Sequence, residues 1–257
     1  MITPTLDLER ELASRGYDLI AGFDEVGRGA LAGPAMVGCA IIRARDLTGE
    51  RTGDAGADGA GPVSALAVPA GVADSKLLTE RRREAIYDEL TGWAAAWAVG
   101  AASNAEIDEW GIGHALGVAA LRALAEAESK LGLDAPGVSA ASNATNAAGE
   151  RRVRVGAILD GPYDYITKAL NTFDAPDVPV PADVTTKVKG DRSCATVATA
   201  AVIAKVTRDR LMERLAERPE YAAYQWAHNK GYGTAVHKAA IAAQGPCDLH
   251  RVSWKLV

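Results

Sequence analysis

The stretch that decides the fold of this chain is Ile20-Ala21-Gly22-Phe23-Asp24-Glu25-Val26-Gly27-Arg28-Gly29. It reads as an apolar strand that leads into two adjacent carboxylates and then a Gly-Arg-Gly turn. Neighbouring side chains of a regular strand point to opposite faces, so Asp24 and Glu25 can serve one site only if the strand ends or bulges there. The two glycines supply that freedom and allow the backbone to approach a ligand closely.

The residue types in this stretch favour a particular chemistry. Paired carboxylates are typical ligands of hard metal ions, and an arginine beside exposed amides favours phosphate or sugar. For an isolated Asp-Glu pair, a polar turn after a core strand would be the commoner interpretation. Further acids in matching positions, described below, favour the metal site.

Length and composition limit the class of protein. The chain has 257 residues, enough for one large domain or two small ones, and 48% hydrophobic with 24% charged residues is the balance of a soluble globular protein. No apolar run approaches the roughly 20 residues that span a bilayer. The three cysteines are far apart and form no C-x-x-C pair, so we expect a cytoplasmic protein without a disulfide framework or zinc site.

The charge of the chain is unevenly distributed. The net charge of −5 is not that of a typical nucleic-acid-binding protein, whose footprint is basic. Basic residues nevertheless cluster between Lys187 and Arg210, and again between Lys230 and Lys238. Phosphate binding depends on such local patches, although a solvated helix face is the simpler interpretation of each cluster.

The pattern of apolar residues predicts an α/β fold with a mixed sheet and a helical C-terminal extension. Two stretches rich in small and polar residues, 47–63 and 132–151, read as exposed loops. We expect an N-terminal helical segment over residues 1–17, a catalytic domain over 18–215 and a C-terminal extension over 216–257 that contributes to substrate binding. Strands are predicted at Asp18–Phe23, Ala35–Ile42, Ser64–Val68, Ala94–Ala101, Val153–Asp160 and Val184–Lys189. Helices are predicted at Leu6–Arg15, His114–Leu131 and Cys194–Leu215, and from Thr79, as N-cap, to Trp93.

Two further acids follow predicted strands. Asp160 ends an apolar strand and precedes a glycine, and Asp191 follows Gly190 after another strand. Each could instead be a turn residue, and Asp191 could cap the helix that follows it. Four carboxylates at one sheet edge would repel one another without a metal. Two divalent ions roughly 3.5–4 Å apart would neutralise them and would support in-line displacement at phosphorus.

Seven motifs in this order give the chain a close resemblance to bacterial ribonuclease HII. They are Asp24-Glu25-Val26-Gly27-Arg28-Gly29, Ala73-Asp74-Ser75-Lys76-Leu77-Leu78-Thr79, Leu159-Asp160-Gly161, Lys189-Gly190-Asp191, Ala204-Lys205-Val206-Thr207-Arg208-Asp209-Arg210, Asn229-Lys230-Gly231-Tyr232-Gly233-Thr234 and His250-Arg251-Val252-Ser253-Trp254. The resemblance implies a ribonuclease H-like fold, with a mixed five-stranded sheet flanked by helices. It also implies an endonuclease that cuts RNA in RNA–DNA hybrids and DNA on the 5′ side of an embedded ribonucleotide.

The resemblance also implies roles for individual residues. Asp24, Glu25, Asp160 and Asp191 would hold two Mg²⁺ or Mn²⁺ ions. The 2′-hydroxyl would be met by Gly27, Arg28 and Gly29, and the sugar at the junction by Tyr232. Phosphate contacts would come from Ser75, Lys76, Lys205 and Arg208, although Arg208 could equally pair with Asp209 on the helix surface. The family's usual serine is replaced by Ala201, so its hydroxyl contact would be missing or supplied by Thr199.

Other features keep two interpretations open. The four histidines show no metal-ligand spacing, so structural or phosphate-adjacent roles are expected for them. The chain could be a non-catalytic nucleic-acid-binding protein on the same fold, or a nuclease directed at DNA. Retention of all four acids argues against the first, and the Gly-Arg-Gly turn with Tyr232 argues against the second. We expect a monomer that acts on hybrids and on DNA duplexes containing ribonucleotides, and not at a membrane.

Overall fold

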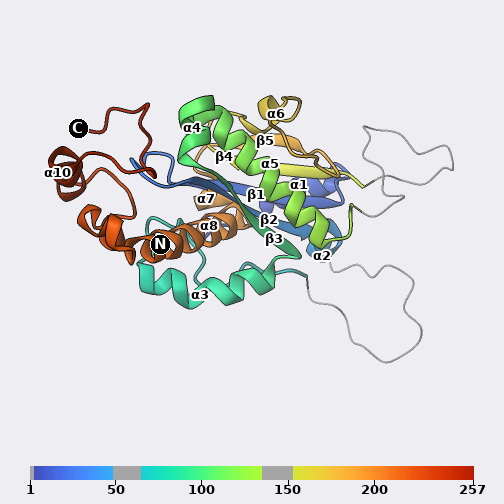
Figure 1. Ribbon diagram of the computed structural model, residues 1–257. Coiled ribbons are helices and arrows are strands. Elements are labelled where there is room, and N and C mark those ends of the chain that lie inside the picture. The colour runs from blue at the N-terminus through green and yellow to red at the C-terminus, as the bar shows by residue number, and fades with distance from the viewer. Residues whose placement is uncertain (1–2, 49–64, 135–152) are drawn as a thin grey trace.

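A computed structural model of the chain describes residues 3–48, 65–134 and 153–257 (Figure 1). Its centre is a five-stranded sheet with the order β3-β2-β1-β4-β5. The strands β1, β2 and β3 pair antiparallel, whereas β4 and β5 run parallel to β1. The bounds are β1 Leu19–Val26, β2 Ala35–Arg43, β3 Ala96–Ala102, β4 Val155–Asp160 and β5 Asp183–Lys187. This confirms the expected α/β class and the mixed five-stranded sheet.

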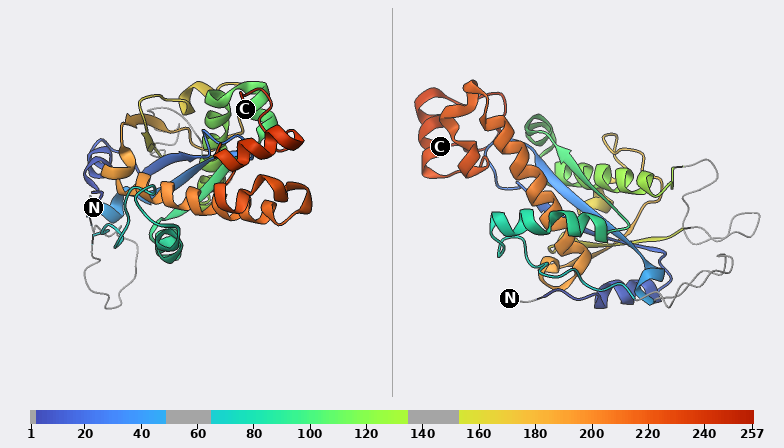
Figure 2. Two further views of the ribbon diagram at one scale, coloured as in Figure 1. Left: turned by 90° about the vertical axis from the view of Figure 1, so that its left-hand side faces the viewer. Right: turned by 90° about the horizontal axis from the view of Figure 1, so that it is seen from below.

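Helices cover both faces of the sheet. The long helix α5 packs on one face, over β2 and β3. On the other face α8 packs over β1 and β2, with α3 beside it (Figures 1 and 2). The helical bounds are α1 Asp7–Ser14, α2 Ala44–Thr48, α3 Glu80–Trp93, α4 Asn104–Trp110, α5 Ile112–Lys130, α6 Ile166–Ala169, α7 Gly190–Ser193, α8 Ala195–Ala216, the 3₁₀ helix η1 Pro219–Tyr224, α9 Trp226–Asn229 and α10 Ala235–Gln244. In the described part of the chain, no helix is both long and apolar enough to cross a membrane.

Small residues bring the helices unusually close to the sheet. A side chain at Gly22 of β1 would have its Cβ 2.3 Å from the backbone of Thr196 in α8, and one at Gly38 would lie 2.4 Å from the carbonyl of Ala200. Such distances are far inside van der Waals contact, so only glycine fits there. These two glycines therefore let α8 cross β1 and β2 at close range.

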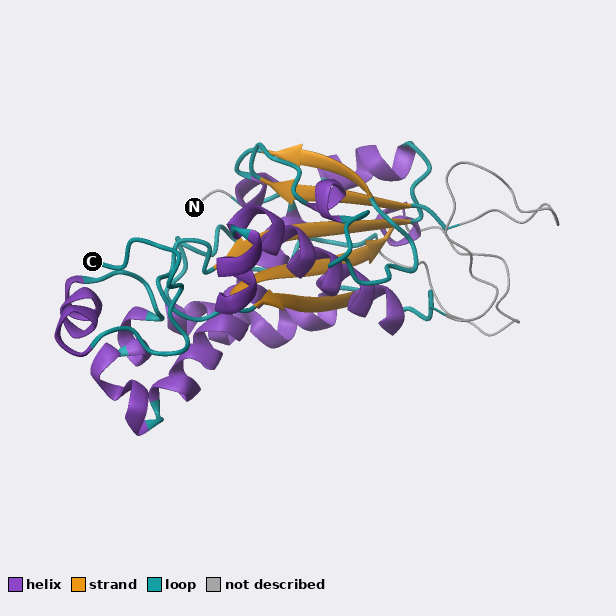
Figure 3. Cartoon of the chain, turned by 45° about the horizontal axis from the view of Figure 1, so that its top comes forward, coloured by secondary structure: helices purple, strands orange, loops and turns teal. Residues whose placement is uncertain are grey.

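The C-terminal elements form a separate cluster at the end of α8, beyond the sheet (Figure 3). The buried Trp226 lies at its centre, packed with Tyr221 and Tyr224, as expected for a core tryptophan. Two isolated bridges, Ala30 with Tyr232 and Ala32 with His250, join this cluster to the turn after β1. The last part of the chain therefore lies against the segment that follows β1.

Most predicted elements are present, and two predictions were wrong. A strand was expected at Ser64–Val68, but its described residues, 65–68, form no strand. Leu66 instead donates its N–H to the carbonyl of Asp46. Leu47, expected to open a loop, belongs to α2. The rest of the two predicted loops lies almost wholly outside the described residues.

Candidate active site

The first two carboxylates leave β1 on opposite faces. Pairing of β1 with β2 continues without a bulge from Leu19 to Val26, so the regular alternation holds at Asp24 and Glu25. The pairing of β1 with β4, however, ends at Phe23 and Leu159. Both acids therefore lie beyond the last β1–β4 pair, at the edge where Asp160 ends β4. At Asp24 and Glu25, β1 is no longer paired with β4 but is still paired with β2.

Burial and like charges disfavour ionisation at this edge. Asp24 is 5% exposed, and its pKa is raised well above the ordinary value by burial first and then by the charges of Glu25, Asp160 and Asp191. Asp191 is equally buried, and its pKa is raised to about 6 by burial and then by Asp160 and Asp74. The four predicted acids thus interact electrostatically as one set.

One lysine supplies positive charge to the acids. Burial opposes the charge on Lys76, but the surrounding carboxylates of Asp24, Asp191, Asp74 and Asp160 together outweigh burial and raise the lysine pKa. The loop that carries Lys76 is fixed by Asp74, which accepts the N–H of Lys76 at 2.9 Å and the Nε–H of Arg192 at 3.0 Å. Ser75, another predicted contact, is buried beside it.

The donor set suits a hard divalent cation. All four side chains offer carboxylate oxygens. A bound cation would offset the repulsion between these negative charges. Among the described residues, no three His, Cys, Asp or Glu side chains already surround one point as ligands of a single ion. The set fits ions whose coordination is completed by water or phosphate oxygens, as is usual for Mg²⁺.

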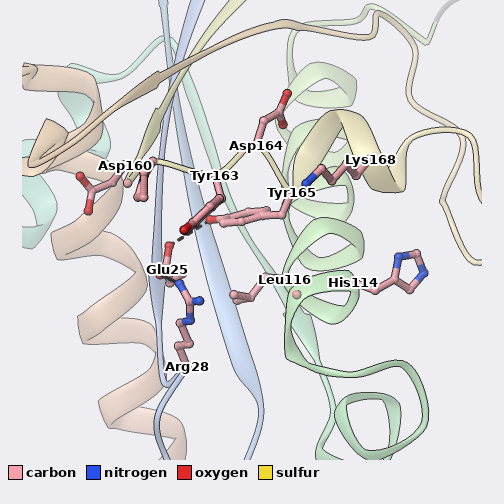
Figure 4. A pocket seen from close by; sticks show the side chains of 12 residues that line it. Glu25, Arg28, His114, Leu116, Asp160, Tyr163, Asp164, Tyr165 and Lys168 are labelled. Carbon is pink, nitrogen blue, oxygen red and sulfur yellow. Dashed lines mark hydrogen bonds and ion pairs between the residues drawn. The ribbon is translucent and has the colours of Figure 1, made fainter.

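A cavity of about 410 Å³ opens on the Glu25 side of the edge (Figure 4). Glu25 accepts the hydroxyl of Tyr165 at 3.1 Å and pairs with Arg28 at 3.2 Å. Asp160 and Lys168 also line the cavity, so it presents both acids and cations. The cavity therefore offers space next to two of the four predicted acids, Glu25 and Asp160.

The Gly-Arg-Gly turn is held from behind by the C-terminal cluster. Gly27 has φ +78°, and its N–H donates to the hydroxyl of Tyr232 at 3.1 Å. The buried guanidinium of Arg251 donates to the carbonyls of Gly27, Arg28 and Gly33 at 2.7, 2.8 and 3.0 Å. Arg251 belongs to one of the seven motifs, but no role was predicted for it. Only the motif marked it, because no periodicity reveals that an arginine will be buried on carbonyls.

Arg208, a predicted phosphate contact, lies inside the protein. Arg208 is fully buried and donates to the carbonyls of Pro34, Lys230 and Ala32, with its guanidinium 5.5 Å from the ring centroid of Tyr232. It therefore neither presents its charge to solvent nor lies on a helix surface. The reason is that α8 passes under the Gly-Arg-Gly turn at this point.

Asp209 pairs with other cations than the expected one. Its carboxylate pairs with Lys205 at 2.5 Å and with Arg83 at 3.4 Å. Lys205, a predicted phosphate contact, is thus half-buried in an ion pair. Thr199, the possible substitute for the usual serine, is buried with a hydroxyl that has no partner among the described residues.

The sequence of the chain is similar to those of one known protein family. The sequence profile of the ribonuclease HII family matches residues 64–257. The ribonuclease HII of Streptomyces avermitilis is 40% identical over 253 residues, which cover 98% of this chain and 83% of the relative. That of Streptomyces griseus is 39% identical over 253 residues, covering 98% and 84%.

Solved structures show the same fold. The ribonuclease H2 of Pyrococcus horikoshii OT3 aligns with a TM-score of 0.52 at 22% identity, covering 93% of this chain and 94% of that one. A Bst-RNase HIII in complex with Mn²⁺ aligns with a TM-score of 0.57 at 20% identity, covering 95% and 70%. These likenesses confirm the ribonuclease H-like fold. With the profile match and the two relatives, they establish that this chain belongs to the ribonuclease HII family of metal-dependent ribonuclease H endonucleases.

Proposed function

We propose that this chain cuts the RNA strand of RNA–DNA hybrids and DNA on the 5′ side of embedded ribonucleotides, with Asp24, Glu25, Asp160 and Asp191 holding two Mg²⁺ or Mn²⁺ ions. The observation that carries the proposal is the crowding of these four acids at one sheet edge, where burial and mutual repulsion raise the pKa of Asp24. Bound divalent ions would activate a water for attack on phosphorus and stabilise the leaving 3′-oxygen.

The chain's own residues would prepare this edge for a phosphate. Asp24 and Asp191 are buried, so their carboxylates gain strongly from a cation. Lys76 lies within the field of the same acids and would partly neutralise an approaching phosphate. Ser75 and Lys205 are proposed to contact the backbone of the substrate, whereas Arg208 would act by holding the turn in place.

Recognition of the ribose would fall to the turn. The 2′-hydroxyl distinguishes RNA from DNA, and the Gly27–Gly29 backbone with the side chain of Arg28 can test for it without reading a base. Tyr232 is fixed to this turn through the N–H of Gly27 and would lie against the sugar. The C-terminal extension would thereby contribute to substrate binding, in a monomer acting in the cytoplasm.

The test compares substrates that differ in ribose content. In Mg²⁺, a duplex with one ribonucleotide should be cut and an all-DNA duplex should not; equal cutting of both would contradict the proposal. Binding without cutting would favour the non-catalytic alternative. Tyr232→Ala should slow cutting at the single ribonucleotide by about tenfold to a hundredfold, as expected for the loss of one aromatic contact.

The loss should be smaller on a continuous hybrid, where other 2′-hydroxyls permit alternative registers. Tyr232→Phe is the matched control, because it keeps the ring and removes only the hydroxyl that accepts the N–H of Gly27. If Tyr232→Ala slows both substrates equally and lowers the melting temperature, Tyr232 is a core residue and not part of the site.

A further inference from the structure

Two buried histidines lie next to each other behind Tyr232, away from the carboxylates. His237 belongs to α10 and His250 to the C-terminal segment, and their side chains are 0% and 1% exposed. Their Nε2 atoms are 3.0 Å apart. A separation this short requires one shared proton, so one ring must donate and the other accept.

The surrounding partners decide which ring donates. The backbone N–H of Cys247 donates to Nδ1 of His250 at 3.0 Å, so that nitrogen carries no proton. The neutral His250 ring must therefore carry its proton on Nε2 and donate it to His237. The thiol of Cys247 lies 3.1 Å from the same Nδ1, where it too can only donate.

The other side of His237 gives the same answer independently. Its Nδ1 lies 2.9 Å from the carbonyl oxygen of Tyr232, which can only accept, so Nδ1 carries the proton. Its Nε2 is then an acceptor, and Nε1–H of Trp226 donates to it at 3.1 Å. A single pair of neutral tautomers is consistent with all these contacts. The lone pair of His237 Nε2 is then shared by the donors of Trp226 and His250, and that of His250 Nδ1 by the two donors of Cys247. Burial favours neutral rings. It is the largest cause that lowers the pKa of His237, and the largest of the causes that lower the pKa of His250 to about 4.

We propose that His237 and His250 are positioning residues: a directional chain of hydrogen bonds from Cys247 through both rings fixes the carbonyl of Tyr232, and so holds its hydroxyl at the N–H of Gly27. This inference rests on the proposed role of Tyr232 at the ribose. The loop needs such support because Lys230, two positions before Tyr232, has φ of +50°, a left-handed conformation that is strained for a residue other than glycine. The carbonyl of Tyr232 also accepts the N–H of Thr234 at 2.8 Å, which leaves His237 as the side-chain contact that sets its direction.

The first experiment reads the tautomers without any substrate. Nitrogen-15 NMR of the imidazole rings in the full chain at neutral pH should show His237 protonated on Nδ1 and His250 protonated on Nε2. His114 and His228, elsewhere in the chain, serve as internal references for assignment. A His237 protonated on Nε2, or charged, at neutral pH would overturn the proposal.

The second experiment separates the two functions of His237. In His237→Asn the side-chain amide can take the place of Nδ1–H and keep the bond to Tyr232. In His237→Gln the amide oxygen can take the place of Nε2 and accept from Trp226 and His250, but the bond to Tyr232 is lost. His237→Gln should therefore cut a single embedded ribonucleotide about threefold to tenfold more slowly than His237→Asn, which is the effect of one hydrogen bond. Equal rates would overturn the proposal.

A double variant keeps the failure of the relay distinct from the failure of the proposed function. Combined with Tyr232→Ala, the difference between the Asn and Gln variants should vanish, and a persisting difference would show that His237 does not act through Tyr232. If Tyr232→Ala alone left cutting unchanged, the proposed role of Tyr232 would be overturned. That outcome would leave the NMR tautomers as predicted, so the two failures are told apart.

Discussion

The carboxylate edge and the Gly-Arg-Gly turn lie next to each other, yet their electrostatics are opposite. At the edge, the acids Asp24 and Asp191 are buried near like charges, and burial with this repulsion raises their pKa values. At the turn, Arg208 and Arg251 are buried cations that donate to backbone carbonyls. The edge is thus short of positive charge, whereas the turn is fixed by cations that the chain itself provides.

This difference separates two ways to build a rigid site. Burying a guanidinium is costly. The pKa of Arg251 is lowered to about 9, and burial is the largest cause. The several carbonyls that it joins hold the turn in one conformation without a ligand. The acids can reach a comparable order only when cations from outside join them. The turn should therefore be preformed, and the edge should be completed on metal binding.

Metal removal should produce the largest effect. Chelation with EDTA should abolish cutting, and added Mg²⁺ or Mn²⁺ should restore it, because hard oxygen donors make up the whole proposed ligand set. Metal should also raise the melting temperature, since it binds only the folded edge. Full activity in excess EDTA would break the comparison, because the edge would then need no outside charge.

Replacing one acid should act almost as strongly. Asp160→Asn keeps the shape of the side chain and its ability to accept the N–H of Gly190, now at 2.7 Å, but removes the charge. We expect cutting to fall by more than about a hundredfold, as for loss of a group that stabilises charge in the transition state, with substrate binding largely retained. Asp191→Asn should act in the same direction. A change in melting temperature alone would identify Asp191 as a helix cap.

Disturbing the turn should affect stability first. Arg251→Lys keeps a charge but not the planar fork that reaches several carbonyls, so unfolding free energy should fall by about 2–4 kcal/mol. Arg28→Lys is the matched control on the same turn, because its side chain is 55% exposed and its loss should cost less than about 0.5 kcal/mol. Urea unfolding of both variants measures the difference. Equal stability of the two would show that the turn is not held by buried charge.

Glu128 tests whether burial alone, without neighbouring acids, explains a raised pKa. It is fully buried on α5, accepts the N–H of Val180 at 2.9 Å, and burial raises its pKa from 4.5 to about 8. The folded state therefore keeps a proton that the unfolded state releases, and stability should fall as pH rises from about 4.5 to about 8. Glu128→Gln should remove this fall and add on the order of 2 kcal/mol at pH 8, with little gain near pH 5.

Two controls sharpen the Glu128 experiment. Glu126→Gln, on the same helix with a side chain 57% exposed, should not change the pH dependence. The gain from Glu128→Gln should also be independent of Mg²⁺, unlike any change at the carboxylate edge. A gain that disappears in Mg²⁺ would mean that Glu128 is coupled to the metal site.

The sequence was most informative where chemistry and local pattern coincide. The apolar run ending in Asp24 predicted β1. Thr79 was predicted as the N-cap of α3, and its side chain accepts the N–H of Arg82. The strand at Ser64–Val68 failed because an apolar run alone does not show whether a sheet edge is available to it. The burial of Arg208 could not be predicted either, since the carbonyls that it binds come from segments as far away as Ala32, 176 positions earlier.

The long-range support of the turn also sets an order of events during synthesis. Gly27 and Arg251 are separated by 224 positions, so a nascent chain that has exposed the turn still lacks the guanidinium that fixes it. Contacts between such distant residues form late, after the local helices and hairpins. On the ribosome, the surface that we propose to recognise ribose, Gly27–Gly29 with Tyr232, would therefore form last. An incomplete chain would carry Asp24 and Glu25 before Arg251 has fixed the turn that we propose to select the substrate.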